Sequence, residues 1–300
     1  MSAIQAWAAT SAAKQSVETN DALLTDFRFA TCPGLLRTST SMKTVVYQSF
    51  RTHQVPAWIT ACMATVKAWA QGKGFDYRFY DDSFLARAPD WFRAKAGQEI
   101  CPVTDLARLV VAKELLAEGY ERTIWVDADM LVFAPEALQV TLERGFVLCH
   151  ELWLYTDATG ARRVSHRVNN SIAAFCAGSL HLDFFIDACV RIARQRDTIG
   201  KLDVGTNFLS QLRQILPFPL LDNVGMLSPA FMAEIVAGQT AGVGEYMQAL
   251  PGALASVNLC GSLQGQRVQG VVAEEGLFDA VAERLLGSRG GVLNDLRAEA

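Results

Sequence analysis

The sequence predicts an α/β fold in which a mostly parallel sheet is covered by helices on both faces. Two observations lead to this fold class. From residue 42 onward, short apolar runs typical of buried strands alternate with longer runs in which apolar residues recur at helical spacing. The links between these segments are short, and a strand–helix–strand–helix–strand order of this kind implies parallel strands.

The first predicted strand is MKTVVYQSF, residues 42–50, which is rich in β-branched and aromatic residues. A helix is predicted to follow over residues 55–74, VPAWITACMATVKAWAQGKG, because its apolar residues repeat at helical spacing and glycines near its end supply a stop. Those apolar residues are Trp58, Ile59, Cys62, Val66 and Trp69. The stretch FDYRFYDD, residues 75–82, then predicts a second strand that ends in two aspartates.

A second helix is predicted over residues 102–119, because PVTDLARLVVAKELLAEG carries an apolar stripe and ends in glycine. Pro102 is expected near its start and Thr104 as its N-cap. The third predicted strand is TIWVDADMLVF, residues 123–133. Polar residues therefore follow each strand at the carboxyl edge of the sheet, where ligands bind in parallel sheets. They are Gln48, Ser49, Asp81, Asp82, Asp127 and Asp129.

The composition changes near residue 42. Residues 1–41 are rich in Ala, Ser and Thr without a sustained period, so we expect an N-terminal extension that need not be ordered. Residues 42–300 are expected to form a single domain. Met42 as the biological start of the chain is a further hypothesis, and finding residues 1–41 in the native protein by intact-mass measurement would overturn it.

Composition and charge narrow the functional classes. The chain is 51% hydrophobic and 19% charged, so it can bury a sizeable core. Its net charge of -4 argues against a dedicated nucleic-acid-binding protein. Neither a secretory signal nor a charge-free window of membrane-spanning length is present, so we expect a soluble cytoplasmic protein, free or peripheral to the inner face of a membrane. The seven cysteines form no C-x-x-C pair and are expected to be mostly buried, reduced thiols.

Asp127 and Asp129 lie one residue apart inside the apolar run RTIWVDADMLVF. In extended backbone, residues i and i+2 point to the same side, so the two carboxylates are expected to converge. Two ionised carboxylates so close among apolar neighbours repel unless one takes a proton or a cation lies between them. Mg²⁺ or Mn²⁺ fits that need, commonly with substrate phosphates as further ligands. The alternative interpretation is a turn with solvated aspartates.

The run VTDLARLVVAKELLAEGYERTIWVDADMLVF resembles the donor-binding segment of GT-A glycosyltransferases. It is most similar to family 8, which holds glycogenin and the bacterial lipooligosaccharide galactosyltransferases, and more distantly to family 32 and the clostridial glucosylating toxins. Members carry an arginine on a helix, then an apolar strand and a D-x-D motif. The matching positions are Arg108, Asp127 and Asp129. Asp105 matches the aspartate that precedes the arginine in the toxins and family 32.

The resemblance implies a GT-A fold and a set of site residues. Asp127, Asp129 and Asn258 would hold a Mn²⁺ or Mg²⁺ ion that bridges the phosphates of a nucleotide-diphosphate sugar, with a UDP-sugar favoured. Asp105 and Arg108, counted with the two aspartates as catalytic, would orient the donor sugar and ribose. The other expected donor-binding residues are Gln48, Ser49, Trp125, Asn169, Asn170, Gly261 and Gln264.

Two later segments match the family with departures. RVNNSIAAF, with Asn169 and Asn170, resembles the Asn-Ala-Gly segment that lines the sugar pocket, and a turn is its alternative. SVNLCGSLQGQ resembles the closing motif His-x-x-Gly-x-x-Lys, in which Gly261 matches, whereas Asn258 replaces the histidine and Gln264 the lysine. Asparagine can offer a carbonyl oxygen to a hard cation, but loss of the lysine charge should weaken the hold on the diphosphate.

A third departure concerns GTNFLSQL, where Gly205 and Thr206 replace the Asp-Gln pair of family 8. A pocket carboxylate is therefore missing unless Asp203 takes its place. Trp153 and Tyr155, in HELWLYTD, could pack against an acceptor sugar, with core packing as the alternative.

The expected function is metal-dependent transfer of a sugar, most simply a hexose, from a nucleotide-diphosphate donor to a saccharide or other small acceptor, with retention as one outcome. Two alternatives stay open. The departures at Gly205, Asn258 and Gln264 allow a GT-A-like domain that binds a nucleotide sugar without transfer. A haloacid-dehalogenase-type phosphatase also has D-x-D after an apolar strand, but Met130 and Leu131 stand where that family has small residues.

Overall fold

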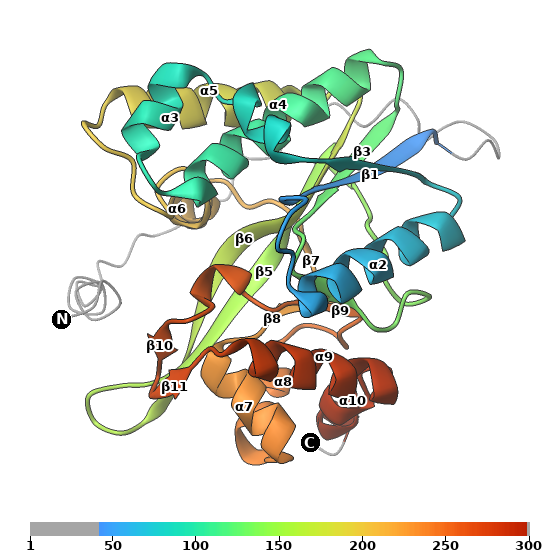
Figure 1. Cartoon of the computed structure of the whole chain (residues 1–300), viewed down its shortest axis with the longest axis vertical. Coiled ribbons are helices and arrows are strands. Elements are labelled where there is room, and N and C mark those ends of the chain that lie inside the picture. Colours follow the sequence, from blue (N-terminus) through green and yellow to red (C-terminus); the bar gives the residue numbers. More distant parts are fainter. Residues whose placement is uncertain (1–41, 299–300) are drawn as a thin grey trace, which may run out of the picture. The chain divides into compact units, whose positions relative to one another are not determined.

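The computed structural model describes residues 42–298 (Figure 1), so the expected extension 1–41 and Cys32 lie outside the described residues. The strands of the central sheet are β1 (Thr44–Ser49), β2 (Asp76–Tyr80), β3 (Arg122–Val126), β5 (Phe146–Thr156), β6 (Arg162–Cys176) and β7 (Leu220–Leu221). Their order is β2-β1-β3-β6-β5-β7. β1 is parallel to β2 and β3, β6 is antiparallel to β3 and β5, and β5 is parallel to β7. Within this sheet β6 alone is reversed, which confirms the predicted α/β fold with a mostly parallel sheet.

Helices cover both faces of this sheet (Figure 1). One face carries α3 (Asp90–Ala96), α4 (Ile100–Ala117), α5 (Leu180–Arg194) and α6 (Thr206–Ile215), and the other carries α2 (Ala57–Gly72). The strand residues alternate between the two faces. Val45 and Tyr47 pack with α4 and α5, whereas Val46 packs with Val66 and Trp69 of α2. The alternation of apolar side chains thus builds a core on each side of the sheet.

A second, smaller sheet packs with the C-terminal helices of the described residues. It contains β4 (Met130–Val132), β9 (Ser256–Asn258) and β8 (Val224–Met226), in that order. The helices α7 (Pro229–Ala237), α8 (Ala241–Ala249), α9 (Glu275–Ser288) and α10 (Gly291–Ala298) pack beside this sheet and α2 in one hydrophobic cluster. A short hairpin of β10 (Arg267–Val268) and β11 (Val271–Val272) precedes α9. Trp58 of α2 stacks on Phe278 of α9 with ring centroids 4.3 Å apart, which joins the two helices.

Two of the predicted elements are wrong in detail. The single strand predicted over 123–133 is divided, because β3 ends at Val126 and the Met130 N–H donates to the Asp127 carbonyl at 3.2 Å to close a turn. The chain then enters the second sheet, so a turn, not extended backbone, carries the aspartates. Thr104 is not an N-cap. The helix α4 begins at Ile100, which places Pro102 in the first turn, where its missing N–H leaves no helical bond unmade. The Thr104 hydroxyl donates to the Ile100 carbonyl at 3.1 Å, as inside a helix.

Two expectations concern the cysteines and the membrane. Among the described residues the free thiols are Cys62, Cys101, Cys149, Cys189 and Cys260, all buried except the partly buried Cys101. Cys176 has an interaction partner and is not counted with them. Within residues 42–298, no helix has the length and apolar character that crossing a membrane requires.

Candidate active site

Asp127 and Asp129 lie where the chain passes from the central sheet to the smaller one. The Asp127 N–H donates to the Ser171 carbonyl of β6 at 2.7 Å, which ties the turn to the central sheet. Beyond the turn, β4 pairs with β9 so that Met130 lies opposite Asn258. This pairing brings the Asn258 side chain to the two carboxylates, although it is far from them in the sequence.

Each carboxylate of the pair is held by specific donors. Asp127 Oδ1 accepts the Trp125 indole N–H at 2.6 Å and pairs with Arg108 Nη1 at 3.2 Å. Asp129 Oδ2 accepts the Gly261 main-chain N–H at 2.7 Å. The Asp127 side chain is 25% exposed, so a ligand can reach it. These contacts occupy one oxygen of each carboxylate and leave the other oxygens facing Asn258.

Burial raises the pKa of both carboxylates of the pair. It is the main cause that raises the pKa of Asp127, which the Arg108 guanidinium opposes and the charge of Asp129 increases further. Burial likewise raises the pKa of Asp129, opposed by the Gly261 N–H. Since a buried carboxylate pair is costly when both groups are ionised, it favours a proton or a cation at this position.

The orientation of Asn258 is fixed by the main chain. Its Oδ1 accepts the Cys260 N–H at 2.6 Å, and because a backbone N–H can only donate, the amino group must point the other way. Nδ2 accordingly lies 3.0 Å from Asp129 Oδ1 and 3.5 Å from Asp127 Oδ2. Ligation of a metal by the Asn258 carbonyl oxygen stays a prediction, and it requires this side chain to turn.

The donor set fits a hard divalent cation through two carboxylates. Among the described residues, no group of three or more His, Cys, Asp or Glu side chains could hold a metal ion. Asp127 Oδ2 and Asp129 Oδ1 both face the Asn258 amino group, so a cation at this point would contact both oxygens. Mg²⁺ and Mn²⁺ commonly use one or two carboxylates and complete their coordination with water and substrate phosphates.

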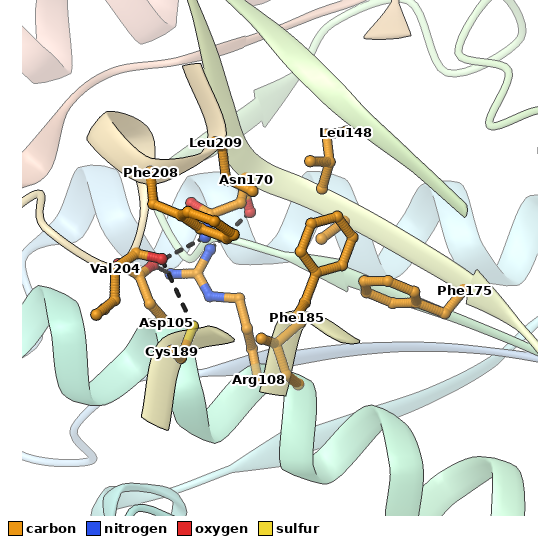
Figure 2. Close-up of a pocket in the computed structure, with 12 residues that line it drawn as sticks. Asp105, Arg108, Leu148, Asn170, Phe175, Phe185, Cys189, Val204, Phe208 and Leu209 are labelled. Atoms are coloured by element: carbon orange, nitrogen blue, oxygen red, sulfur yellow. Dashed lines mark hydrogen bonds and ion pairs between the residues drawn. The ribbon is translucent and has the colours of Figure 1, made fainter. Parts of the chain in front are cut away.

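Arg108 connects the pair to Asp105 by ion pairs with Asp127 and Asp105. Figure 2 shows Arg108 beside Asp105. Its side chain is buried, with Nη2 at 3.2 Å from Asp105 Oδ1 and Nη1 donating to the Asn170 carbonyl at 2.6 Å. The guanidinium also lies 4.9 Å from the centre of the Trp125 ring, a cation–π distance. Burial alone would lower the pKa of Arg108, but Asp127 and Asp105 hold it above its usual range. Arg108 therefore remains charged and orients Asp127 from behind.

Asp105 is buried at the same centre. It accepts the Asn170 amide N–H at 2.9 Å, and burial raises its pKa while Arg108 and Asn170 lower it. A cavity of about 20 Å³ lies behind these side chains (Figure 2). It is lined by the Asp105 and Arg108 side chains and by apolar residues that include Leu109, Leu148, Phe175, Phe185 and Phe208. Its volume is that of about one water molecule, so a ligand as large as a sugar does not fit there.

Asn169 and Asn170 are neighbours on β6 and face different groups. Asn169 donates to Glu151 Oε2 at 2.8 Å and accepts the Ser171 N–H at 2.5 Å, whereas Asn170 faces Asp105. The turn considered for this pair is wrong, because both residues lie inside the strand. Because neighbouring residues of a strand point to opposite sides, Asn169 and Asn170 reach two different buried carboxylates, those of Glu151 and Asp105.

Glu151 is a candidate site residue that the sequence reasoning missed. It is 4% exposed and accepts the Trp153 indole N–H at 2.7 Å, the Asn169 amide, and the Thr206 hydroxyl at 3.4 Å. Arg167 Nη1 lies 3.4 Å from it. A lone charge inside the apolar stretch FVLCHELWL was the signal that could have identified it.

The contact between the loop before α6 and Asp105 explains why glycine occupies position 205. A Cβ on Gly205 would lie 2.4 Å from Asp105 Oδ2, so only glycine fits beside that carboxylate. Asp203 does not reach this point, because its carboxylate accepts the Gly200 N–H at 2.8 Å and pairs with Arg196 at 2.9 Å. Glu151 is the carboxylate that lies beside Thr206.

The remaining predicted site residues divide into two groups. Gln48 is buried, donates to the Asp127 carbonyl at 3.1 Å and accepts the Tyr77 hydroxyl at 2.9 Å, so it supports the turn. Gly261 is required by space, since a Cβ there would lie 2.8 Å from Trp58 and 3.2 Å from Asp129. By contrast, the Ser49 hydroxyl is 3.5 Å from the Asp81 carbonyl and Gln264 is exposed. The structure does not bring these two to the pair through any described contact.

No protein-family model matches this chain, and no curated protein matches it. Solved glycosyltransferase structures are similar to it at low identity. One, involved in the glycosylation of the major capsid of PBCV-1, gives a TM-score of 0.41 at 12% identity and covers 73% of this chain and 95% of that chain. Mouse xyloside xylosyltransferase 1 gives 0.39 at 10% identity, covering 74% and 99%. GlyE of Streptococcus pneumoniae TIGR4 gives 0.39 at 9% identity, covering 86% and 64%.

Proposed function

We propose that this chain is a metal-dependent glycosyltransferase that moves a sugar from a nucleotide-diphosphate donor, most simply a UDP-sugar, to an acceptor hydroxyl. One observation supports this above the others. Asp127 and Asp129 lie together beyond the carboxyl end of β3, with a guanidinium on one carboxylate and a main-chain N–H on the other. The carboxyl edge of a parallel sheet is the usual ligand site of such folds.

In the proposed reaction, the bond between the anomeric carbon and the diphosphate oxygen breaks, and that oxygen keeps the electron pair. The acceptor oxygen forms the new bond to the anomeric carbon, and its proton passes to solvent. When bound at Asp127 and Asp129, Mn²⁺ or Mg²⁺ supplies Lewis-acid stabilisation of the charge on the departing diphosphate. Arg108 favours the ionised form of Asp127 and fixes its orientation, so little rearrangement is needed during transfer.

The sugar is proposed to lie toward Asn169 of β6 and Glu151 of β5. Asn169 donates to Glu151 Oε2 at 2.8 Å, so the two polar groups are held in fixed positions. Carboxylates and amides in fixed positions recognise sugar hydroxyls by hydrogen bonding. Trp153, which is half-buried and donates to Glu151, offers an aromatic side chain beside this group for an acceptor.

A second function has one observation in its favour. The Asn258 amino group already faces both carboxylates, which is a position that a cation would take. A protein that binds nucleotide sugars weakly, without transfer, would tolerate this arrangement. The cytoplasmic location and the retaining outcome are predictions of the sequence alone.

A donor screen tests the proposal. Purified full-length protein would be incubated with UDP-, GDP-, CDP- and ADP-sugars in MnCl₂, in MgCl₂ or in EDTA, and nucleotide release would be measured with water and with simple sugars as acceptors. We expect metal-dependent release from at least one donor and its loss in Asp127→Asn. Binding of a donor without release under any condition would favour the binding function, and release unaffected by EDTA and by Asp127→Asn would reject the metal-dependent transferase.

A further inference from the structure

The site carries more negative than positive charge. The carboxylates of Asp105, Asp127 and Glu151 are paired with the guanidinium groups of Arg108 and Arg167, and Asp129 is held by uncharged donors. Four carboxylates thus meet two guanidinium groups in the described contacts. A diphosphate would add further negative charge, and one divalent cation at the aspartate pair would only balance the excess already present. A further cation near the pair would therefore favour binding of the diphosphate.

Lys201 is the residue positioned to supply it. It is half-buried, in the segment between α5 and α6, and its Nζ donates to the Ser262 carbonyl at 3.2 Å. The residue before Ser262 is Gly261, whose N–H bonds to Asp129. The ammonium group therefore contacts the residue that directly follows Gly261, the main-chain donor to Asp129. An ammonium has three N–H donors and this contact uses one of them.

The segment that carries Lys201 is anchored on both sides. The Ile199 N–H donates to the Lys95 carbonyl at 3.0 Å, and the Gly200 N–H donates to Asp203 at 2.8 Å. Farther on, Gly205 packs directly against Asp105. With the main chain of the segment held on both sides, little main-chain freedom needs to be lost when Lys201 binds an anion.

We infer that Lys201 binds the phosphate groups of the nucleotide-diphosphate ligand, and that it bridges them to the Gly261 loop. The inference rests on the proposed function and adds to it a phosphate-binding residue from an element that the sequence motifs did not include. Charge-assisted hydrogen bonds to phosphate are among the strong polar contacts in proteins, so the lysine should contribute substantially to affinity.

Calorimetric titration of three variants tests this inference. Lys201→Met removes the charge at similar length, and Lys201→Arg keeps it. Lys113→Met is the matched control, because Lys113 of α4 forms an exposed ion pair with Asp183 of α5. The probes are UDP, GDP, CDP and ADP in MgCl₂, each beside its monophosphate and nucleoside. We expect Lys201→Met to weaken the preferred diphosphate at least about tenfold, the monophosphate less, and the nucleoside not at all. Lys201→Arg should stay within about threefold of the wild type, and Lys113→Met should match it.

The outcomes separate the two proposals. Wild-type binding of a diphosphate with unchanged affinity in Lys201→Met overturns the inference and leaves the proposed function standing. An equal loss for the diphosphate and the nucleoside also overturns it, since that pattern reports a loosened structure. If the wild type binds none of the diphosphates, the proposed function and the inference fail together.

Discussion

Replacement of Gly205 by alanine tests whether the segment before α6 fixes Asp105. The new Cβ would lie 2.4 Å from Asp105 Oδ2 and 3.0 Å from its Cγ. Ordinary contact begins near 3.4 Å, so a gap of about 1 Å must open. Asp105 cannot easily move away, because it is 6% exposed and held by Arg108 and Asn170 at 3.2 and 2.9 Å.

The cost of this clash follows from its surroundings. Overpacking in a well-packed interior lowers the free energy of unfolding by about 1–3 kcal/mol, and a displaced ion pair places the loss of Gly205→Ala toward the upper part of that range. Urea denaturation followed by circular dichroism measures this loss. Gly276→Ala is the matched control, since a Cβ there meets no atom within 4 Å and alanine favours the helix α9.

The same variant should also weaken ligand binding. Movement of Asp105 disturbs Arg108, which holds Asp127, so nucleotide-diphosphate affinity should fall about tenfold in Gly205→Ala and not in the control. If Gly205→Ala unfolds at the wild-type urea concentration and binds with wild-type affinity, the packing of this segment on Asp105 is refuted.

Three further predictions concern the thiol beside the site, the aspartate pair and the smaller sheet. Burial and, to a smaller extent, Asp105 raise the pKa of Cys101 to about 11, so the rate of its alkylation should rise only at strongly alkaline pH. In Asp105→Asn that rise should occur at lower pH, as followed by peptide mass spectrometry. An unshifted pH profile would contradict the placement of the two groups. Asn258→Asp replaces a hydrogen-bond donor 3.0 Å from Asp129 by a third carboxylate. Without metal, we expect the free energy of unfolding to fall by about 2 kcal/mol or more. MnCl₂ should narrow that loss in thermal melts, and a loss of equal size in MnCl₂ and EDTA would speak against a cation at the pair. Tyr246→Phe removes bonds of 2.7 and 2.9 Å to the Met226 carbonyl and N–H, and should lower the free energy of unfolding by about 1–3 kcal/mol in urea titrations, whereas a change within error would show that these groups find other partners.

The sequence predicts the local elements of the central sheet well, because their signals are local. Val45, Val46 and Tyr47 alternate between two cores, and the apolar stripe of α2 faces one of them. The boundary at Val126 escaped prediction, since apolar residues continue on both sides of the aspartates and only pairing with β9 shows that the chain has changed sheets. Such pairing joins residues far apart along the chain and leaves no local pattern.

The candidate site divides in the same way. Asp127, Asp129 and Arg108 are recognisable from the sequence because strand, helix and motif lie in one continuous stretch. Glu151 and Lys201 are not, since their relation to the pair depends on a long hairpin strand and on an irregular segment before α6. The Asn258 orientation depends on one main-chain N–H, which only coordinates reveal.

The most direct test of the central claim is calorimetric titration of UDP, GDP, CDP and ADP into the wild type and into Asp129→Asn, each in MnCl₂ and in EDTA. Asparagine keeps an oxygen for the Gly261 N–H, so the turn should persist while one cation ligand loses its charge. We predict binding of at least one diphosphate in MnCl₂, at least about tenfold weaker in EDTA and in Asp129→Asn. Equal affinity in all four conditions, or no binding in any, would contradict a nucleotide-diphosphate site at this aspartate pair.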